Sequence, residues 1–376
     1  MALVGRLAPE TTEAERLEGL LRAQAHLHAL GVTAWQDAII GEHGDGGDPS
    51  GAYRAADEAG LLTARVVGAL WWDRDAGLEQ VPDLVARRDA LSTPGFRATT
   101  VKIMQDGVPE NFTAAMLDPY CDGHGRSTDN AGISFVPVET LGPAAVALDA
   151  AGFQLHFHAI GDRAVRECLD AVEAALRANG RRDARHHLAH LQVVHPDDVA
   201  RFRDLGVVAT IQAFWAVLEA QMVELTLPFL GEPRASWQYP FGDLQRSGAV
   251  LAMGSDWAVS TADPLAAIHV AVNRTVPDGY RDGEPEHPGI PPRAAHRPRH
   301  RAHGVHRRVR VREPPRRHRD DPPRRARRPR RPRPRPVRGA AGRDRRRSRP
   351  RDVRGRPAGV RGVRGVTSPG RWAPIR

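Results

Sequence analysis

The chain has 376 residues and a formal net charge of +10, but this charge is unevenly distributed along the sequence. Residues 292–376 contain 32 arginines and five acidic residues, whereas residues 1–291 carry a net charge of −17. The overall charge therefore does not indicate a protein that binds nucleic acid over its whole length. We expect a folded domain at residues 1–291 and a disordered, arginine- and proline-rich tail at residues 292–376.

Hydropathy and cysteine content narrow the class of protein further. The sequence has no run of about 18 apolar residues, so we expect no membrane-spanning helix. The N-terminus lacks the basic and then apolar pattern of a signal peptide. Cys121 and Cys168 are too few for a disulfide framework, which favours a reducing, cytoplasmic location.

Helix and strand patterns alternate along the acidic part of the chain. Thr12 and Glu15 match a capping box, and leucines at near-helical spacing follow until Gly31. Asp162 is expected to cap a strong helix that ends before Gly180. Strands are predicted at residues 32–36, 63–71, 99–107, 153–160, 187–194, 207–212 and 249–256. Further helices are predicted at residues 53–59, 78–91, 138–151, 196–205 and 264–272.

Each predicted strand is a short and nearly continuous apolar run. This pattern is typical of a parallel sheet that is buried on both faces. Seven strand–helix units predict an α/β fold, namely an incomplete (β/α)8, TIM-like barrel. The polar segment 108–132 is expected to form a loop above a strand end, either as a substrate-contacting loop or as a plain surface insertion.

Polar side chains stand at the carboxyl ends of four predicted strands. They are Lys102, which is the only lysine in the chain, His158, His190 and Asp256. Histidine and carboxylate ligands at neighbouring strand ends suit zinc or a similar divalent ion. Such an ion generates hydroxide at neutral pH and polarises a carbonyl group, and a nearby carboxylate can pass a proton to a leaving amine. These residues therefore favour hydrolysis, with Asp256 as the catalytic carboxylate.

Each of these residues also has a structural interpretation. A single strand histidine is more often a core residue than a ligand, and His156 lies deeper than His158 on the same strand face. Lys102 inside an apolar strand requires a partner or a chemical change, because a buried ammonium group is costly. Pairing with Asp106 or another acid is the alternative to a role in a metal site.

Four segments carry a resemblance to a known family. They are Val101–Gly107, His156–Ala164, Arg185–His190, and Gly254–Trp257 followed by Asp263–Leu265. Together they resemble the metal-dependent amidohydrolase superfamily, in particular its branch of YtcJ-like and N-substituted formamide deformylase-like hydrolases. The resemblance covers roughly residues 10–275.

The resemblance implies a distorted barrel that holds one or two divalent ions. It implies that Lys102 is carboxylated and bridges the ions, that His158 and His190 hold one of them, and that Asp256 is both ligand and proton shuttle. Asp106, His156, Asp162, Arg163 and Trp257 are expected to support these ligands or to contact the substrate. The implied substrate is a small molecule with an amide-type or formamide-type C–N bond.

The sequence departs from the family pattern in two places. The His-x-His pair of the family's first strand is absent, so we expect weak metal binding and low activity. After residue 291 the chain turns into arginine- and proline-rich sequence, which suggests a shifted reading frame near residues 288–295. The alternative is a catalytically inactive protein whose basic tail binds nucleic acid nonspecifically.

Overall fold

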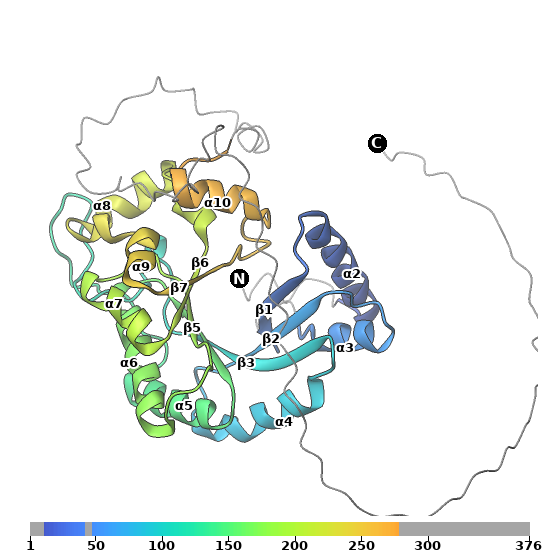
Figure 1. Cartoon of the computed structure of the whole chain (residues 1–376). Coiled ribbons are helices and arrows are strands. Elements are labelled where there is room, and N and C mark those ends of the chain that lie inside the picture. Colours follow the sequence, from blue (N-terminus) through green and yellow to red (C-terminus); the bar gives the residue numbers. More distant parts are fainter. Residues whose placement is uncertain (1–10, 42–46, 278–376) are drawn as a thin grey trace, which may run out of the picture. The chain divides into compact units, whose positions relative to one another are not determined.

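The structure is a computed structural model that describes residues 11–41 and 47–277 (Figure 1). The chain divides into two compact units, Met1–Arg312 and Glu313–Arg376, and every described residue belongs to the first. The predicted boundary at residue 291 and the predicted tail lie outside the described residues. None of the helices in the described ranges is long and apolar enough to cross a membrane.

Seven parallel strands form one sheet in which sequence order and spatial order are the same. The strands are β1 Ala34–Ile40, β2 Arg65–Trp71, β3 Phe96–Met104, β4 Gln154–Ala159, β5 His187–His190, β6 Val208–Ile211 and β7 Val250–Met253. The sheet curves, and helices α2 to α7 run along its outer side (Figure 1). The predicted incomplete (β/α)8 barrel is therefore confirmed.

Helices fill the connections between the strands, as a parallel sheet requires. The α-helices are α2 Glu13–Ala29, α3 Ser50–Glu58, α4 Val81–Leu91, α5 Val138–Ala150, α6 Asp162–Asn179, α7 Pro196–Leu205, α8 Leu227–Leu230, α9 Phe241–Ser247 and α10 Pro264–Asn273. Short 3₁₀ turns lie at Leu78–Gln80, Pro109–Asn111, Ala213–Ala216 and Arg234–Trp237, and a π-helical turn lies at Met222–Thr226. The capping box of α2 is present, with Thr12 and Glu15 bonding reciprocally.

The central strands are buried on both faces. Phe157 on β4 and Ile103 on β3 are fully buried and belong to one large apolar cluster with the inner faces of the outer helices. The outer strands β1 and β7 of the described sheet are only partly buried, and Val250 on β7 is 64% accessible. The sheet is open between β1 and β7, which are the two ends of the strand order.

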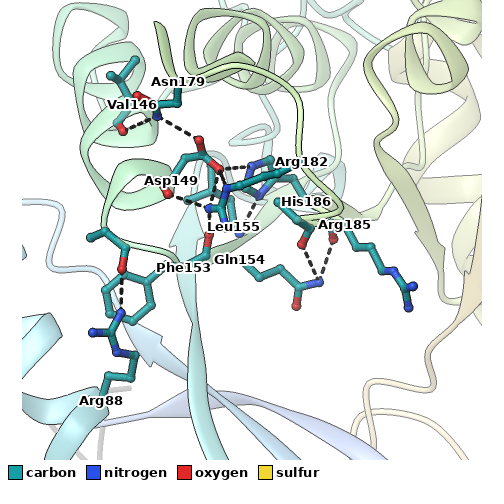
Figure 2. A network of polar contacts seen from close by, with 12 residues as sticks. Arg88, Val146, Asp149, Phe153, Gln154, Leu155, Asn179, Arg182, Arg185 and His186 are labelled. Carbon is teal, nitrogen blue, oxygen red and sulfur yellow. Dashed lines mark hydrogen bonds and ion pairs between the residues drawn. The ribbon is translucent and has the colours of Figure 1, made fainter. Parts of the chain in front are cut away.

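A polar network joins the amino ends of β4 and β5 to the ends of α5 and α6 (Figure 2). Asp149 Oδ1 accepts hydrogen bonds from His186 Nε2 at 3.0 Å and from Arg182 Nε at 2.9 Å, and Oδ2 accepts one from Asn179 at 2.8 Å. The other ring nitrogen of His186 accepts the backbone N–H of Leu155 at 3.0 Å. Both nitrogens of this imidazole are thus satisfied within the protein.

Some local expectations from the sequence were wrong. The strands predicted at residues 99–107 and 249–256 end at Met104 and Met253. The strand predicted at residues 187–194 ends at His190, because His190 and Leu191 adopt φ values of +80° and +52° and leave the extended conformation. Asp162 does not cap α6. Gly161 is the cap residue, and the Asp162 carboxylate accepts the backbone N–H of Leu117 at 2.9 Å instead.

Candidate functional site

Lys102, His156 and His187 form a row across three neighbouring strands. Strand register aligns Lys102 with His156, and His156 with His187, so the three side chains share one face of the sheet. Lys102 Nζ lies 3.1 Å from His156 Nε2, and the rings of His156 and His187 have centroids 4.3 Å apart. Gln36 on β1 accepts a hydrogen bond from His187 Nε2 at 2.9 Å and ties the first strand to this row.

His158 lies one layer closer to the carboxyl end of β4 and is held by Asp106. The Asp106 carboxylate is fully buried, and its Oδ1 lies 3.1 Å from His158 Nδ1. The same carboxylate accepts three backbone N–H groups, from Ala115, Ile160 and Gly161, at 3.0, 3.0 and 2.8 Å. A carboxylate in this position keeps the proton on Nδ1 and leaves the lone pair of His158 on Nε2.

His190 is brought to His158 by an unusual backbone conformation. Register pairs His190 with Ala159, so regular alternation would turn its side chain away from the His158 face. The φ of +80° breaks this alternation, and the two imidazole centroids lie 4.4 Å apart. Trp215 stacks on the other side of His190, with centroids 4.9 Å apart and planes 17° apart.

Asp256 follows β7 and also has a positive φ, +54°. Non-glycine residues in this region are strained, and such strain is concentrated at functional sites. Asp256 lines the same cavity as Lys102 and His190. Trp257 next to it is 44% exposed and stacks on His26 of α2, with ring centroids 5.3 Å apart.

The cavity has a volume of about 580 Å³ and is open on one side. Its walls come from α2 and β1 on one side and from the segment between β7 and α10 on the other. His156, Lys102 and His190 form part of its floor, and His158 lies beside His190. Three of the four predicted ligands thus line one cavity, and the fourth contacts one of them.

Burial determines the protonation states of the lysine and the histidines at the floor of the cavity. Desolvation lowers the pKa of Lys102 to about 8, although the charge of Asp256 acts in the opposite direction. Burial also lowers the pKa of His156 and of His190 well below the ordinary value, and lowers that of His187 to about 3. The positive charge of Lys102 adds to the effect on all three rings. These imidazoles are therefore neutral at pH 7.

Asp162 and Arg163 lie at the start of α6 and contact the loop at residues 108–132 rather than the histidine rings. Burial raises the pKa of Asp162, and its second carboxylate oxygen has no partner among the described residues. Arg163 donates to the carbonyl of Gly132 at 3.2 Å. A Cβ on Gly161 would lie 2.0 Å from the Ala115 carbonyl oxygen, and one on Gly132 would lie 1.9 Å from that of Ala114. Gly161 therefore allows the loop to pack directly against the β4–α6 junction, and Gly132 allows the two ends of the loop to pack against each other.

Two residues of the cavity wall, Asp37 and Gln212, were not identified from the sequence. Asp37 in the middle of β1 accepts a hydrogen bond from the hydroxyl of Tyr53 at 2.8 Å, and burial raises the pKa of its carboxyl group. Gln212 directly follows β6 and accepts the backbone N–H of His190 at 2.6 Å. The position of Gln212 at a strand end was a usable signal. A glutamine or an aspartate carries little chemical information by itself, however, so the partner across the sheet had to be known.

The donor atoms fit a metal ion only in part. The Nδ1 atoms of His156 and His190 are buried and have no hydrogen-bond partner among the described residues. Within the same residues, no three His, Cys, Asp or Glu side chains lie close enough together to form a metal site. The structure therefore brings together His158 and His190 as a pair with available nitrogens, and Asp256 lines the same cavity as His190 without completing a ligand set.

A curved parallel sheet with polar side chains at the carboxyl ends of its strands defines a TIM-like α/β barrel with its site in the usual place. Residues 1–298 match the sequence model of the Amidohydrolase family. The chain belongs to this family, as its motifs indicated.

Relatives with known sequences and structures agree with this assignment. The chain is 31% identical over 288 residues to Protein LONG AFTER FAR-RED 3 of Arabidopsis thaliana, covering 74% of this chain and 47% of that protein. It is 27% identical over 272 residues to Putative amidohydrolase YtcJ of Bacillus subtilis, covering 72% of this chain and 48% of that protein. The chain thus spans about half the length of these relatives.

The fold is also similar to solved structures. An uncharacterized metal-dependent hydrolase from Pyrococcus furiosus superimposes with a TM-score of 0.57 at 24% identity, covering 72% of this chain and 52% of that one. An uncharacterized metal-dependent hydrolase from Pyrococcus horikoshii gives a TM-score of 0.56 at 23% identity, covering 70% of this chain and 49% of that one. At this level of identity the similarity establishes the fold.

Proposed function

We propose that this protein is a metal-dependent hydrolase that acts on non-peptide C–N bonds of the amide or formamide type. The pairing of His158 with His190 beside a cavity lined by Lys102 and Asp256 is the observation that carries the proposal. Family membership and the metal-dependent hydrolases among its structural neighbours support it.

His158 and His190 would hold a divalent ion such as zinc, with Lys102 and Asp256 as further ligands. When bound, the ion would polarise the substrate carbonyl and make a water molecule nucleophilic at neutral pH. Since the described residues contain no complete ligand set, we expect the chain to bind metal weakly.

Lys102 would join the ligands as a carbamate. A pKa of about 8 leaves a substantial fraction of the amine neutral near pH 7.5, and only the neutral amine can attack carbon dioxide. The nitrogen of the neutral amine forms a bond to the carbon of CO₂, one C–O π bond gives its electron pair to oxygen, and the nitrogen loses a proton, so a neutral amine becomes a carbamate anion. Together with the proton that the ammonium group first loses, two protons are released when the cation is converted into the anion. The change also removes the unfavourable burial of an ammonium group.

Asp256 would transfer the proton from the attacking water to the leaving amine. Its carboxylate takes the proton of the attacking water and passes it to the amine that leaves, a role that requires a carboxylate within reach of the scissile bond. Asp106 and the row of buried neutral histidines hold the floor of the cavity in place while this happens.

Purified protein tests the proposal directly. After dialysis against zinc and then against metal-free buffer, bound metal would be counted by mass spectrometry. Release of primary amine would be followed with a panel of N-substituted formamides and N-acyl amines. We expect substoichiometric zinc, slow zinc-dependent amine release, and loss of at least about 100-fold in rate in Asp256→Asn. Amine release that is unchanged in Asp256→Asn would contradict the proposed role of this residue.

The charge of residues 292–376 supports a second candidate, nonspecific binding of nucleic acid. Contacts of this kind weaken steeply with salt because they depend on counterion release. Binding of a random-sequence RNA at 50 and 200 mM salt, with and without residues 292–376, tests it. Binding that does not change when these residues are deleted would argue against the tail as the contact.

A further inference from the structure

Gln212 lies at the carboxyl end of β6, between the two strand ends that carry His190 and Asp256. Its side chain is buried to 95%, because only 5% of the residue is accessible, and it lines the same cavity as both of these residues. Its backbone is fixed as well, since its carbonyl accepts the N–H of Trp215 at 3.0 Å.

The orientation of the Gln212 amide follows from its contact with His190. The backbone N–H of His190 can only donate, so the atom 2.6 Å from it must be the carbonyl oxygen Oε1. The amide nitrogen Nε2 therefore occupies the other side of the group. No acceptor for Nε2 is found among residues 11–41 and 47–277, so its two N–H groups are not used by this part of the protein.

Gly254 leaves space around this nitrogen. A Cβ atom at position 254 would lie 2.6 Å from Gln212 Nε2, so any other residue there would displace the amide. The residue directly after β7 is thus a glycine at the point where the amide reaches the cavity. The result is a preoriented hydrogen-bond donor next to Gly254, two residues before Asp256, that has no acceptor among the residues that the structure describes.

We propose that Gln212 is a further catalytic residue whose Nε2 donates a hydrogen bond to the carbonyl oxygen of the substrate. This inference rests on the proposed hydrolase function. As the water oxygen bonds to the carbonyl carbon, the π bond breaks and its electron pair moves onto the oxygen that faces Nε2. The C–N bond then breaks with its electron pair on nitrogen, which receives the proton carried by Asp256.

A donor in this place stabilises the charge that develops on the oxygen more than it stabilises the neutral carbonyl. It also restricts the substrate to a compound whose carbonyl group can enter between His190 and Asp256. Carboxylate products offer the same acceptor atoms, so the donor should bind a small carboxylate such as formate even without turnover.

Two substitutions separate donation by Nε2 from support of His190 by Oε1. Gln212→Glu keeps an acceptor for the His190 N–H but replaces the donor with a negatively charged oxygen. Gln212→Met removes both groups at similar volume. Gln192→Glu is the matched control, because Gln192 is equally buried and bonds to Gln238 at 3.0 Å rather than lining the cavity.

Formate affinity is measured by NMR titration with ¹³C-formate, and turnover is measured with an N-substituted formamide at saturating zinc. If Nε2 is the donor, both Gln212 variants bind formate at least tenfold more weakly and lose about 100-fold in kcat, with little change in KM. The control retains wild-type values. Wild-type behaviour of Gln212→Glu, with loss only in Gln212→Met, would show a purely structural role and overturn the proposal.

The formate titration also tests the proposed role of Gln212 independently of the proposed hydrolysis. Absence of amine release by the wild-type protein would refute the proposed hydrolysis, whereas the formate affinities still decide whether Gln212 provides the donor. Wild-type protein that does not bind formate, or that binds it no better than the variants, would overturn the inference about Gln212 regardless of turnover.

Discussion

Two buried histidine–aspartate pairs lie at opposite ends of the same central strands and differ in what they leave unsatisfied. At the amino ends, Asp149 accepts from His186, and the second nitrogen of that ring accepts the Leu155 N–H (Figure 2). At the carboxyl ends, Asp106 holds His158 through Nδ1, but Nε2 has no hydrogen bond among the described residues. The first pair is a closed structural network, and the second presents a free lone pair next to His190.

The comparison teaches that the partners of a buried histidine are more informative than its burial. Both carboxylates are almost completely buried, and both receive several hydrogen bonds. A satisfied network stabilises a fold, whereas a buried ring nitrogen without a partner is costly unless a ligand supplies one. Function is therefore expected at the end of the sheet where nitrogens remain free.

The strongest test of the comparison removes one histidine from each pair. His158→Ala should weaken zinc binding at least 100-fold while leaving the fold intact, because it removes a proposed ligand. His186→Ala should leave zinc affinity unchanged but lower the free energy of unfolding by about 2 kcal/mol, since it leaves Asp149 and the Leu155 N–H unsatisfied. Competition with a chromogenic chelator and urea denaturation measure the two effects. Equal loss of zinc affinity in both variants would contradict the division.

Replacing each carboxylate by an amide tests the same difference between the two pairs. Asp106→Asn should weaken zinc binding by about 10- to 100-fold, because an amide no longer fixes the proton of His158 on Nδ1. Asp149→Asn should cost about 3 kcal/mol of stability through loss of its contacts with Arg182 and His186, with no change in zinc affinity. The tautomer of His158, followed by ¹⁵N NMR, provides a measurement independent of stability, and it should change only in Asp106→Asn.

The pH dependence of stability provides a third test that distinguishes the Asp149–His186 network from the Asp106–His158 pair. Burial lowers the pKa of His186, so the unfolded chain takes up a proton below about pH 6.5 that the folded protein does not. Burial alone would raise the pKa of Asp149, but hydrogen bonds from Asn179 and Arg182 outweigh it and lower the pKa. The stability that the ionised Asp149 contributes is therefore present above about pH 4 and is lost as the pH falls below this value.

We expect the urea midpoint of the wild-type protein to fall between pH 7 and pH 5 and again below pH 4. His186→Gln should flatten part of the first decrease, and Asp149→Asn should flatten the second. Parallel curves for Asp149→Asn and wild type below pH 4 would show that this carboxylate does not contribute to acid unfolding.

The smallest expected effect comes from the edge of the closed network. Asn179→Ala removes the hydrogen bonds from Nδ2 to Asp149 Oδ2 and to the Val146 carbonyl, while Arg182 and His186 still contact the carboxylate. A loss of about 1 kcal/mol in the free energy of unfolding is expected, with unchanged zinc affinity. A loss much larger than that of His186→Ala would indicate that Asn179, rather than the histidine, anchors the network.

The sequence predicted most of the fold because its signals are local. Apolar runs, the Thr12–Glu15 capping box and the glycine after α6 are each read within a few residues, and the structure has the corresponding elements. The end of β5 was misplaced because the positive φ of His190 has no clear signature in the side chains. Asp162 was misassigned because its partner, Leu117, lies 45 residues away.

The candidate site was predictable to the same extent. Lys102, His158, His190 and Asp256 were predicted as ligands from their chemistry and their places at strand ends, and this role stays a prediction, although Lys102, His190 and Asp256 line one cavity. Asp106 was predicted to support the ligands, and it lies against His158. Gln212 contacts His190 on another strand, and a glutamine alone does not indicate which partner it has. The separation of Asp256 from the two histidines likewise depends on how far the sheet opens between β1 and β7, which no local pattern specifies.

The close approach of Gly161 to the backbone of Ala115 has a mechanical consequence. Two chain segments in direct backbone contact are expected to move together, so displacement of the loop would carry the first turn of α6 and the end of β4 with it. Lengthening of the loop should therefore be compatible with folding only at its exposed tip, near residues 122–126.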